Sequence, residues 1–341
     1  MMFDPVLLSA SSSGMGFLSP LYWLFGVCMN FLLSLFGNQY FVAIVVFTVI
    51  TRLVLLPLNV RQQRTMSKSA RLQPKIQKIQ KKYDPKNVAD ARERQKVQMK
   101  LNEEMQALYA REGHNPMQMG CGTMVFQMLF LMGIVGIIYY PLSYVIGISD
   151  FASVHADIQT TVTEFLTAAG ANAPRNLQLS ILENWFELKD TLIQQFPAIF
   201  TEANCAEIEA FRNGLSIGSI DMTVIPTWKG GIIVIVPILS FITALGSSLI
   251  STFVQRKNNP AMAQQGSQMM LMMLMMPFFS LFIAFQVPAA VGFYWIVSNV
   301  VAMLQQIFIA KAFPPKKSQA RLMVENTIER RSREENVKKI K

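Results

Sequence analysis

Five apolar segments constrain this chain more than any other feature, because each is about as long as the 20 residues that a helix needs to cross a bilayer. The last two form one apolar run that is too long for a single span, and Pro288 supplies a break where the backbone can turn at the membrane surface. With 52% hydrophobic and 15% charged residues, the chain is too apolar for an ordinary soluble protein. The sequence therefore predicts an all-α, polytopic membrane protein with five transmembrane helices, at about residues 40–60, 122–147, 231–254, 269–286 and 289–311.

An earlier apolar segment, from Phe17 to Phe36, is short and contains Pro20 and Asn30. Gly37 follows it as a turn signal. We expect an interfacial helix that lies on the membrane, and a sixth span is the alternative.

The distribution of charge predicts the orientation, because cytoplasmic loops carry the excess of Lys and Arg. Residues 52–114 hold 15 basic against 6 acidic residues, and the tail from Lys311 holds 10 against 4, so both are expected in the cytoplasm. Residues 149–229 hold 4 basic against 10 acidic residues and are expected outside. With five spans, the N-terminus then lies outside and the C-terminus in the cytoplasm.

This orientation divides the chain into nine parts. They are an outside N-terminus with the interfacial helix (1–38), the first span (39–60), a basic cytoplasmic helical hairpin (61–114), the second span (121–148), an extracytoplasmic segment (149–229), the third span (230–254), a cytoplasmic loop (255–268), the fourth and fifth spans (269–311) and a basic cytoplasmic tail (312–341).

The extracytoplasmic segment carries one apolar pattern of its own. Its spacing predicts an amphipathic helix that rests on the membrane or on a partner. The residues of this pattern are Leu182, Trp185, Phe186, Ile193 and Phe196.

The basic segment after the first span keeps a helical period on both sides of an Asp84-Pro85 turn signal. Spacings of three and four residues place each apolar set on one helix face, which predicts an antiparallel helical hairpin. The two stripes are Leu72, Ile76, Ile79 and Tyr83, and Val97, Leu101, Met105 and Leu108.

The other faces of this hairpin are rich in Lys, Arg and Gln. One interpretation is a solvated hairpin whose charge only follows the positive-inside rule. The other is a docking arm for anionic lipid headgroups, a protein partner or ribosomal RNA. The candidate docking residues are Arg71, Lys75, Lys78, Lys81 and Lys82.

Arg52 is the first candidate functional residue, because it is the only charged side chain in the interior of a predicted span. A charge at the centre of a membrane helix costs about 2.5–3.5 kcal/mol, so Arg52 needs a watery or polar environment. Thr48 lies four residues earlier and therefore on the same helix face.

Further polar residues recur at helical spacing in the other spans, mostly from mid-membrane to the cytoplasmic side. Singly, such residues usually form interhelical hydrogen bonds of about 0.6 kcal/mol each. Together they indicate a hydrated cavity that opens inward and is closed outside, because a through-channel would need polar lining along its full length. They are Thr123 and Gln127, then Ser240, Thr243, Ser247 and Ser251, and last Tyr294, Ser298 and Gln305 beside Trp295, Asn299 and Gln306.

An ordered set of short motifs resembles the YidC/Oxa/Alb family of membrane protein insertases, in its short five-span bacterial form. The set covers all five spans and the hairpin. It consists of Thr51-Arg52-Leu53-Val54-Leu55-Leu56-Pro57-Leu58, Leu72-Gln73-Pro74-Lys75-Ile76, Asn115-Pro116-Met117 through Gly120-Cys121, Gln127-Met128, Met276-Pro277, Pro288, and Tyr294-Trp295 through Ser298-Asn299 with Gln305 and Gln306.

The resemblance implies a membrane insertase and chaperone, without enzymatic activity, in the bacterial plasma membrane. It implies that nascent membrane proteins enter an inward-open hydrophilic groove and leave sideways into the lipid, with or without the Sec translocon. By the resemblance, Arg52 is the positive charge of the groove, and Tyr294 and Trp295 contact the substrate. The hairpin receives the nascent chain, and the basic tail, which includes Lys316, approaches the ribosome. The extracytoplasmic segment is longer than a compact family member needs.

We expect no cofactor and no metal. No phosphate-binding glycine loop is present in the sequence, the three cysteines are unevenly spaced, and His114 and His155 fall on opposite sides of the predicted topology. Two other functions stay open. An anion-binding secondary transporter could also use a buried Arg, although the sequence contains no visible inverted repeat, and a passive assembly scaffold would hold subunits without moving them.

Overall fold

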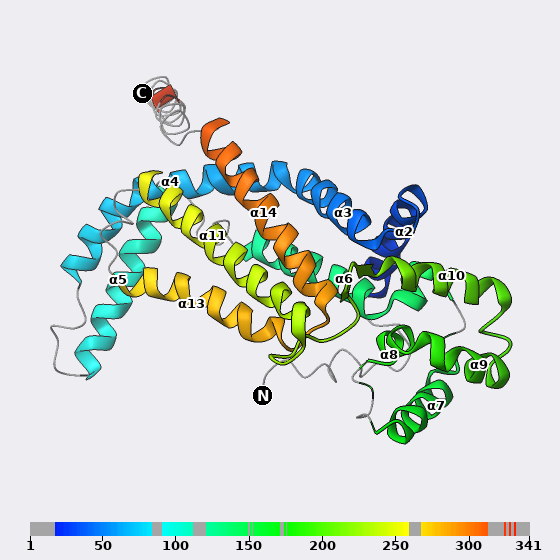
Figure 1. The fold of residues 1–341 in the computed structure, drawn as a ribbon. Coiled ribbons are helices and arrows are strands. Elements are labelled where there is room, and N and C mark those ends of the chain that lie inside the picture. Colours follow the sequence, from blue (N-terminus) through cyan, green and yellow to red (C-terminus); the bar gives the residue numbers. More distant parts are fainter. Residues whose placement is uncertain are drawn as a thin grey trace. The chain divides into compact units, whose positions relative to one another are not determined.

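The computed structural model describes residues 18–83, 91–111, 121–148, 151, 153–170, 174, 176–258 and 267–312, together with 324, 327, 328 and 331 of the tail (Figure 1). Two units are compact by themselves. The first comprises Met1–Leu53, Gln127–Leu245 and Met276–Val301, and the second comprises Val54–Phe126, Gly246–Met275 and Ala302–Lys341. Helices account for most of the described residues, so the prediction of an all-α membrane protein is confirmed.

The apolar helices agree with most of the predicted spans. In the described part, two helices are long and apolar enough to cross a membrane, and a third span results if the helices on either side of the break at Leu55 are counted together. Gln127–Tyr139 and Met275–Ala284 are shorter apolar helices within the other two predicted spans. The number five therefore stays a prediction. The helices concerned are α3 (Tyr40–Val54), α6 (Cys121–Tyr139), α11 (Ile235–Asn258), α13 (Ser267–Ala284) and α14 (Ala289–Ala312).

The predicted interfacial helix is α2 (Ser19–Leu35), and it packs closely against the short helix η3 (Leu142–Ile146). Asn30 Nδ2 donates a 2.7 Å hydrogen bond to the carbonyl oxygen of Val145. A Cβ atom on Gly26 would collide with the carbonyl of Tyr144, so only glycine permits this approach. The other face of α2 exposes large apolar side chains, which suits contact with lipid; they include Trp23, Val27, Phe31 and Leu35.

The described residues between 151 and 229 form a helical region, which we call the loop domain. Four helices and one two-stranded hairpin surround its core, and the helices form one group in Figure 1. Two of the helices begin with side-chain caps, because Asn176 accepts from the Leu179 N–H and Thr201 accepts from the Asn204 N–H. The elements are α7 (His155–Ala168), α8 (Leu177–Glu183), α9 (Trp185–Gln195), α10 (Glu202–Gly214), β1 (Ser216–Ile217) and β2 (Ile220–Asp221).

The core of the loop domain corrects one prediction. Leu182 and Trp185 were expected in an amphipathic helix that rests on the membrane or on a partner, but both are fully buried inside the domain, and Trp185 packs near Phe200. Ile193 and Phe196 are partly buried against the same core. Only Phe186, with 61% of its surface exposed, keeps an outward apolar side chain. The apolar pattern at positions 182–196 therefore belongs to a folded domain. Neighbouring helices of that domain cover most of its apolar side chains.

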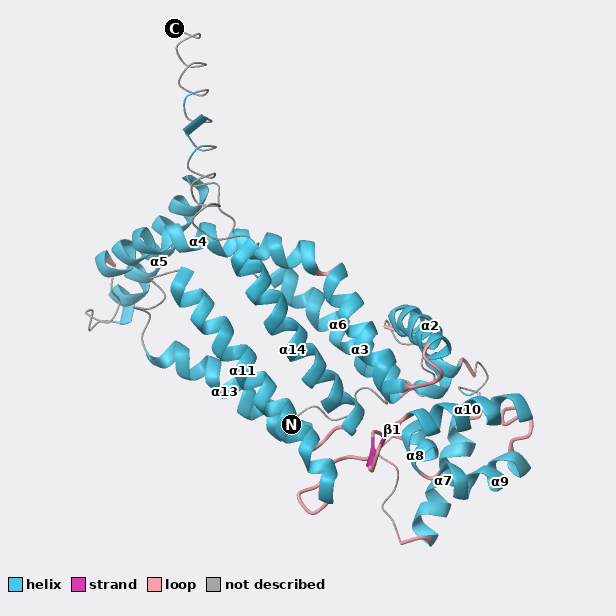
Figure 2. Cartoon of the chain, turned by 45° about the horizontal axis from the view of Figure 1, so that its top comes forward, coloured by secondary structure: helices cyan, strands magenta, loops and turns pink. Residues whose placement is uncertain are grey.

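In the second unit, α4 (Leu56–Lys82) and α5 (Ala91–Arg111) pack against each other as an antiparallel hairpin (Figure 2). Leu72, Ile76 and Leu101 are buried between them, and the other residues of both predicted stripes are half-buried, so the predicted apolar stripes are confirmed. The Asp84-Pro85 turn lies outside the described residues.

Candidate functional site

Arg52 lies in the last turn of α3, in a helix that is otherwise apolar or carries only hydroxyl groups. Its side chain is half-buried. The Nη2 atom donates a 2.5 Å hydrogen bond to the Ser298 hydroxyl and a 3.3 Å hydrogen bond to the Ser298 carbonyl oxygen. These two acceptors compensate part of the cost of holding a guanidinium among apolar side chains.

Ser298 and Tyr294 lie one turn apart on α14, and both are buried. Tyr294 is close enough to Arg52 and Ser298 to interact with both of them electrostatically. The structure thus brings together three residues that the sequence proposed for the groove. They come from α3 and α14, which are far apart in the sequence.

Thr48 is also buried, but its hydroxyl donates to the carbonyl oxygen of Ile44 at 2.6 Å. Thr51, which sequence reasoning did not select, donates to the carbonyl oxygen of Thr48 at 2.9 Å. Both hydroxyls are therefore satisfied by the backbone of their own helix. This arrangement places polar groups beside Arg52 without leaving a buried donor unpaired.

Polar side chains also join α11 to α14. In the first unit, Asn299 Nδ2 donates to Thr243 Oγ1 at 3.4 Å. In the second unit, Gln306 Nε2 donates to Ser251 Oγ at 3.1 Å. Such interhelical bonds are worth about 0.6 kcal/mol each in membranes. Asn299, which was predicted to line the groove, thus has an interhelical partner. Among the described residues, the Ser240 hydroxyl is buried with no hydrogen-bond partner.

The other predicted groove residues differ in environment. Gln127 is exposed, and Trp295 is half-buried against the hydrophobic core of the first unit. Ser247 and Gln305 are half-buried and belong to the second unit, whereas Arg52 belongs to the first. Their place in a common groove stays a prediction.

The predicted docking residues of the hairpin include one that also holds the hairpin together. Lys75, Lys78, Lys81 and Lys82 are exposed, and the side chain of Arg71 lies outside the described residues. Lys82 forms a 2.7 Å ion pair with Glu104, which also accepts a 2.8 Å hydrogen bond from the Tyr83 hydroxyl. The hydrogen bond between Lys82 and Glu104 lowers the pKa of Glu104, and the same bond raises the pKa of Lys82.

The loop domain covers the ends of several apolar helices. Gln178 Oε1 accepts from the backbone N–H of Leu142 at 3.0 Å, at the start of η3. Phe211 packs edge-to-face on Tyr40 at the start of α3, with ring centroids 5.6 Å apart. The domain also contacts the start of α14 through backbone hydrogen bonds, such as the one from the Ala289 N–H to the carbonyl oxygen of Val224. The loop domain therefore contacts the starts of three helices of the first unit.

Comparison with known families identifies the class of protein. Residues 31–317 match the family described as 60Kd inner membrane protein, and the match includes the hairpin, the loop domain and every predicted span. The chain belongs to this family, the YidC/Oxa insertases. The resemblance that the sequence motifs indicated is thus confirmed.

Several relatives of this YidC/Oxa family member are bacterial proteins. It is 26% identical over 333 residues to membrane protein insertase YidC 1 of Listeria monocytogenes, which covers 96% of the chain and 83% of the relative. It is 27% identical over 291 residues to membrane protein insertase MisCA of Bacillus subtilis, covering 85% and 77%. It is 28% identical over 303 residues to membrane protein insertase YidC of Oceanobacillus iheyensis, covering 88% and 84%. The family and the apolar helices together indicate a multi-pass protein of the bacterial cell membrane.

The described residues of this family member offer no metal site, since nowhere among them do three His, Cys, Asp or Glu side chains gather. The chemistry of its candidate site is that of a guanidinium, hydroxyls and aromatic rings. Such a set can attract an anionic group and contact an apolar one, and it contains no nucleophile with an adjacent base.

Proposed function

We propose that this protein is a membrane insertase that receives nascent hydrophobic segments in an inward-open hydrophilic groove and releases them sideways into the bilayer. Arg52 is the positive charge of the groove and attracts acidic residues of the segment that must cross. Tyr294 and Trp295 contact the apolar part of the substrate. Family membership and the names of the relatives support membrane protein insertion as the function.

One observation carries this proposal. A guanidinium in an apolar helix is held by Ser298, beside Tyr294, on a second helix whose start is covered by the loop domain. A polar site that is closed at one end suits a cavity that hydrates half of the membrane. Such a cavity shortens the dry path for a polar segment, whose full barrier is about 30 Å of hydrocarbon.

No covalent step is needed in this mechanism. The driving force is burial of the apolar substrate segment in lipid, aided by the membrane potential at about 2.3 kcal/mol per negative charge moved outward per 100 mV.

In the proposed orientation the N-terminus and the loop domain are outside, and the hairpin and the basic tail are in the cytoplasm. The hairpin lysines and the tail then face the ribosome and lipid headgroups, and the Sec translocon is an optional partner.

The experiment uses the purified full chain in proteoliposomes and a short single-span substrate with an acidic translocated segment. Arg52→Ala is expected to lower the initial rate of insertion by at least about tenfold, which corresponds to 1.4 kcal/mol. Arg52→Lys should keep most of the rate, because the groove needs the charge more than the planar guanidinium. A substrate with a neutral translocated segment is the matched control and should depend little on Arg52.

Two results would contradict the proposal. Equal insertion by the wild type and Arg52→Ala for both substrates would remove the role of the charge. Uptake of a small anion into the same vesicles, without insertion of any substrate, would favour a transporter, and assembly of preinserted subunits without insertion would favour a scaffold.

A further inference from the structure

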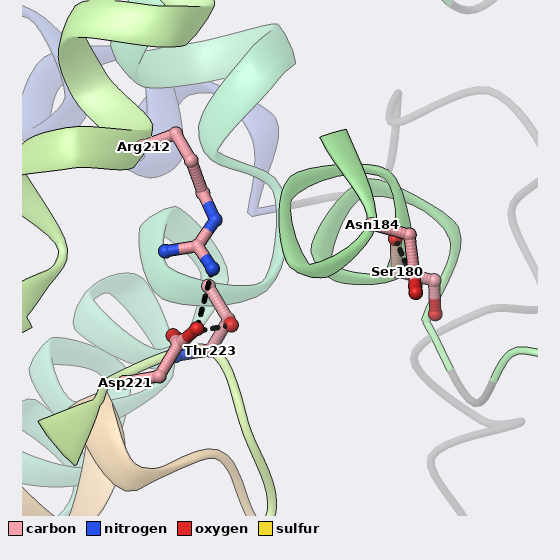
Figure 3. A network of polar contacts seen from close by, with 5 residues as sticks. All are labelled: Ser180, Asn184, Arg212, Asp221 and Thr223. Atoms are coloured by element: carbon pink, nitrogen blue, oxygen red, sulfur yellow. Dashed lines mark hydrogen bonds and ion pairs between the residues drawn. The ribbon is translucent and has the colours of Figure 1, made fainter. Parts of the chain in front are cut away.

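Asp221 is the centre of a polar network in the loop domain, at the end of the hairpin strand β2 (Figure 3). Its Oδ1 atom accepts hydrogen bonds from the Thr223 N–H at 2.9 Å and the Thr223 hydroxyl at 2.6 Å. Its Oδ2 atom accepts from Nη2 of Arg212, in the last turn of α10, at 2.5 Å. The carboxylate therefore fixes the backbone on both sides of Met222.

This ion pair is largely removed from water. The side chains of Arg212 and Asp221 are 12% and 26% exposed, and Met222 and Thr223 are buried. Removing one partner of such a pair leaves a poorly solvated charge behind, so the pair constrains its surroundings more than a surface pair does.

The segment that Asp221 fixes also holds the start of α14. The carbonyl oxygen of Met222 accepts from the Ala290 N–H at 2.9 Å, and that of Val224 accepts from the Ala289 N–H at 2.9 Å. The first four N–H groups of a helix have no partner within the helix. In α14, the third and fourth of these N–H groups, those of residues 291 and 292, donate to the carbonyl oxygen of Pro288. All four are thus satisfied, two of them by the loop domain.

The same helix carries the residues of the candidate groove. Tyr294 lies little more than one turn after Ala290, and Ser298 follows one turn later and accepts from Arg52. A helix that is held at its first turn is fixed in rotation and in position along its axis. The contacts therefore run from Arg212 through Asp221 and the Met222–Val224 segment to the face of α14 that meets Arg52.

From this geometry we infer that Arg212 and Asp221 are positioning residues for the groove helix α14. They hold the Met222–Val224 segment as a cap that keeps the end of α14 closed and aligns Tyr294 and Ser298 with Arg52. The consequence for insertion rests on the proposed function, whereas the cap itself does not.

The test compares two ion pairs of the loop domain in the full-length protein in lipid nanodiscs. Arg212→Ala breaks the pair that supports the cap, and Arg212→Lys restores a cation. Lys189→Ala is the matched control, because Lys189 pairs with Glu209 at 3.0 Å between α9 and α10. The first readout is hydrogen–deuterium exchange of a peptide that covers Ala289 and Ala290, measured without substrate. The second is the initial rate of insertion in proteoliposomes.

We expect Arg212→Ala to speed exchange at Ala289 and Ala290 by about tenfold, because exchange follows the population of the opened cap. Arg212→Lys should stay within about threefold of the wild type, and Lys189→Ala should leave this peptide unchanged. Insertion should fall in Arg212→Ala and recover in Arg212→Lys.

The cap is overturned if Arg212→Ala leaves exchange at this peptide unchanged, or if Lys189→Ala raises it equally, since the latter would show general loosening of the domain. The positioning role is overturned if exchange rises in Arg212→Ala and insertion stays at the wild-type rate. If the wild type itself inserts nothing, the proposed function fails, and the exchange data still decide whether the cap exists.

Discussion

The Arg52 guanidinium donates a 2.5 Å hydrogen bond to the Ser298 hydroxyl, across 246 residues of sequence. This contact joins α3 to α14 inside the apolar part of the first unit. Arg52 can therefore have two roles. It can be a charge that attracts the substrate, and it can be a structural link between two helices.

Ser298→Ala separates these roles, because it removes the hydroxyl acceptor and keeps both the charge of Arg52 and the Ser298 carbonyl acceptor. We expect this variant to insert an acidic-segment substrate faster than Arg52→Ala does, because the charge stays and the carbonyl acceptor offsets part of the lost charge-assisted hydrogen bond, which is worth about 1.5–3 kcal/mol. Insertion rates in proteoliposomes, with Arg52→Ala measured in parallel, check this. A larger loss in Ser298→Ala than in Arg52→Ala would mean that the link matters more than the charge.

Gly26→Ala should destabilise the packing of α2 on η3. The added Cβ meets the carbonyl group of Tyr144, and backbone must shift to make room, at a cost of about 1–3 kcal/mol. The midpoint of thermal unfolding in detergent measures the effect. Gly246→Ala is the matched control in another helix, because its Cβ would lie 3.5 Å from Met303 Sδ in ordinary contact. Equal midpoints for the two variants would contradict the close approach of α2.

Leu101→Ala should open the α4–α5 hairpin, because Leu101 is buried between the two helices and such truncations cost about 2–5 kcal/mol. Amide exchange of α5 peptides should rise strongly. Met99→Ala, at a position that is 58% exposed on the same helix, is the control and should change little. If both variants behaved alike, the apolar stripe would not hold the hairpin.

The stability of α7 in the loop domain should fall on acidification. Burial lowers the pKa of His155 from its ordinary value of 6.5, so the folded domain prefers the neutral imidazole. The unfolded segment then binds more protons below pH 6.5, and the stabilisation present above that value is lost as the pH falls through the lowered pKa. Exchange of α7 peptides, corrected for intrinsic rates, at pH 7.5 and about pH 5.5 tests this. His155→Gln should show a smaller difference between the two pH values, and an unchanged difference would exclude His155 as the cause.

The sequence was sufficient for those features that repeat at a fixed spacing. The stripes of Leu72, Ile76 and Leu101 specified the hairpin, and the lone charge of Arg52 marked the site, because both signals are local. The sequence selected both Arg52 and Ser298 for the candidate groove, but it did not predict that they pair, since no spacing relates residues so far apart.

The loop domain was beyond such reasoning. Trp185 and Leu182 have the spacing of an amphipathic helix, and only tertiary packing shows that their apolar face is already covered. The Arg212–Asp221 pair gave no sequence signal in α10. Asp221 and Thr223, two residues apart, have the spacing of a local side-chain turn and could have been noticed.

The cap on α14 has a consequence for how the protein itself is made. Met222 and Val224 are translated before Ala289 and Ala290, whose N–H groups donate hydrogen bonds to their carbonyl oxygens. Most buried residues of the loop domain are likewise translated before the last two spans, and we expect them to pack before those spans leave the ribosome. We expect the docking of α14 on the Met222 and Val224 carbonyl groups to be the last step in folding of the first unit. A nascent chain stalled before residue 289 would then already hold a folded loop domain.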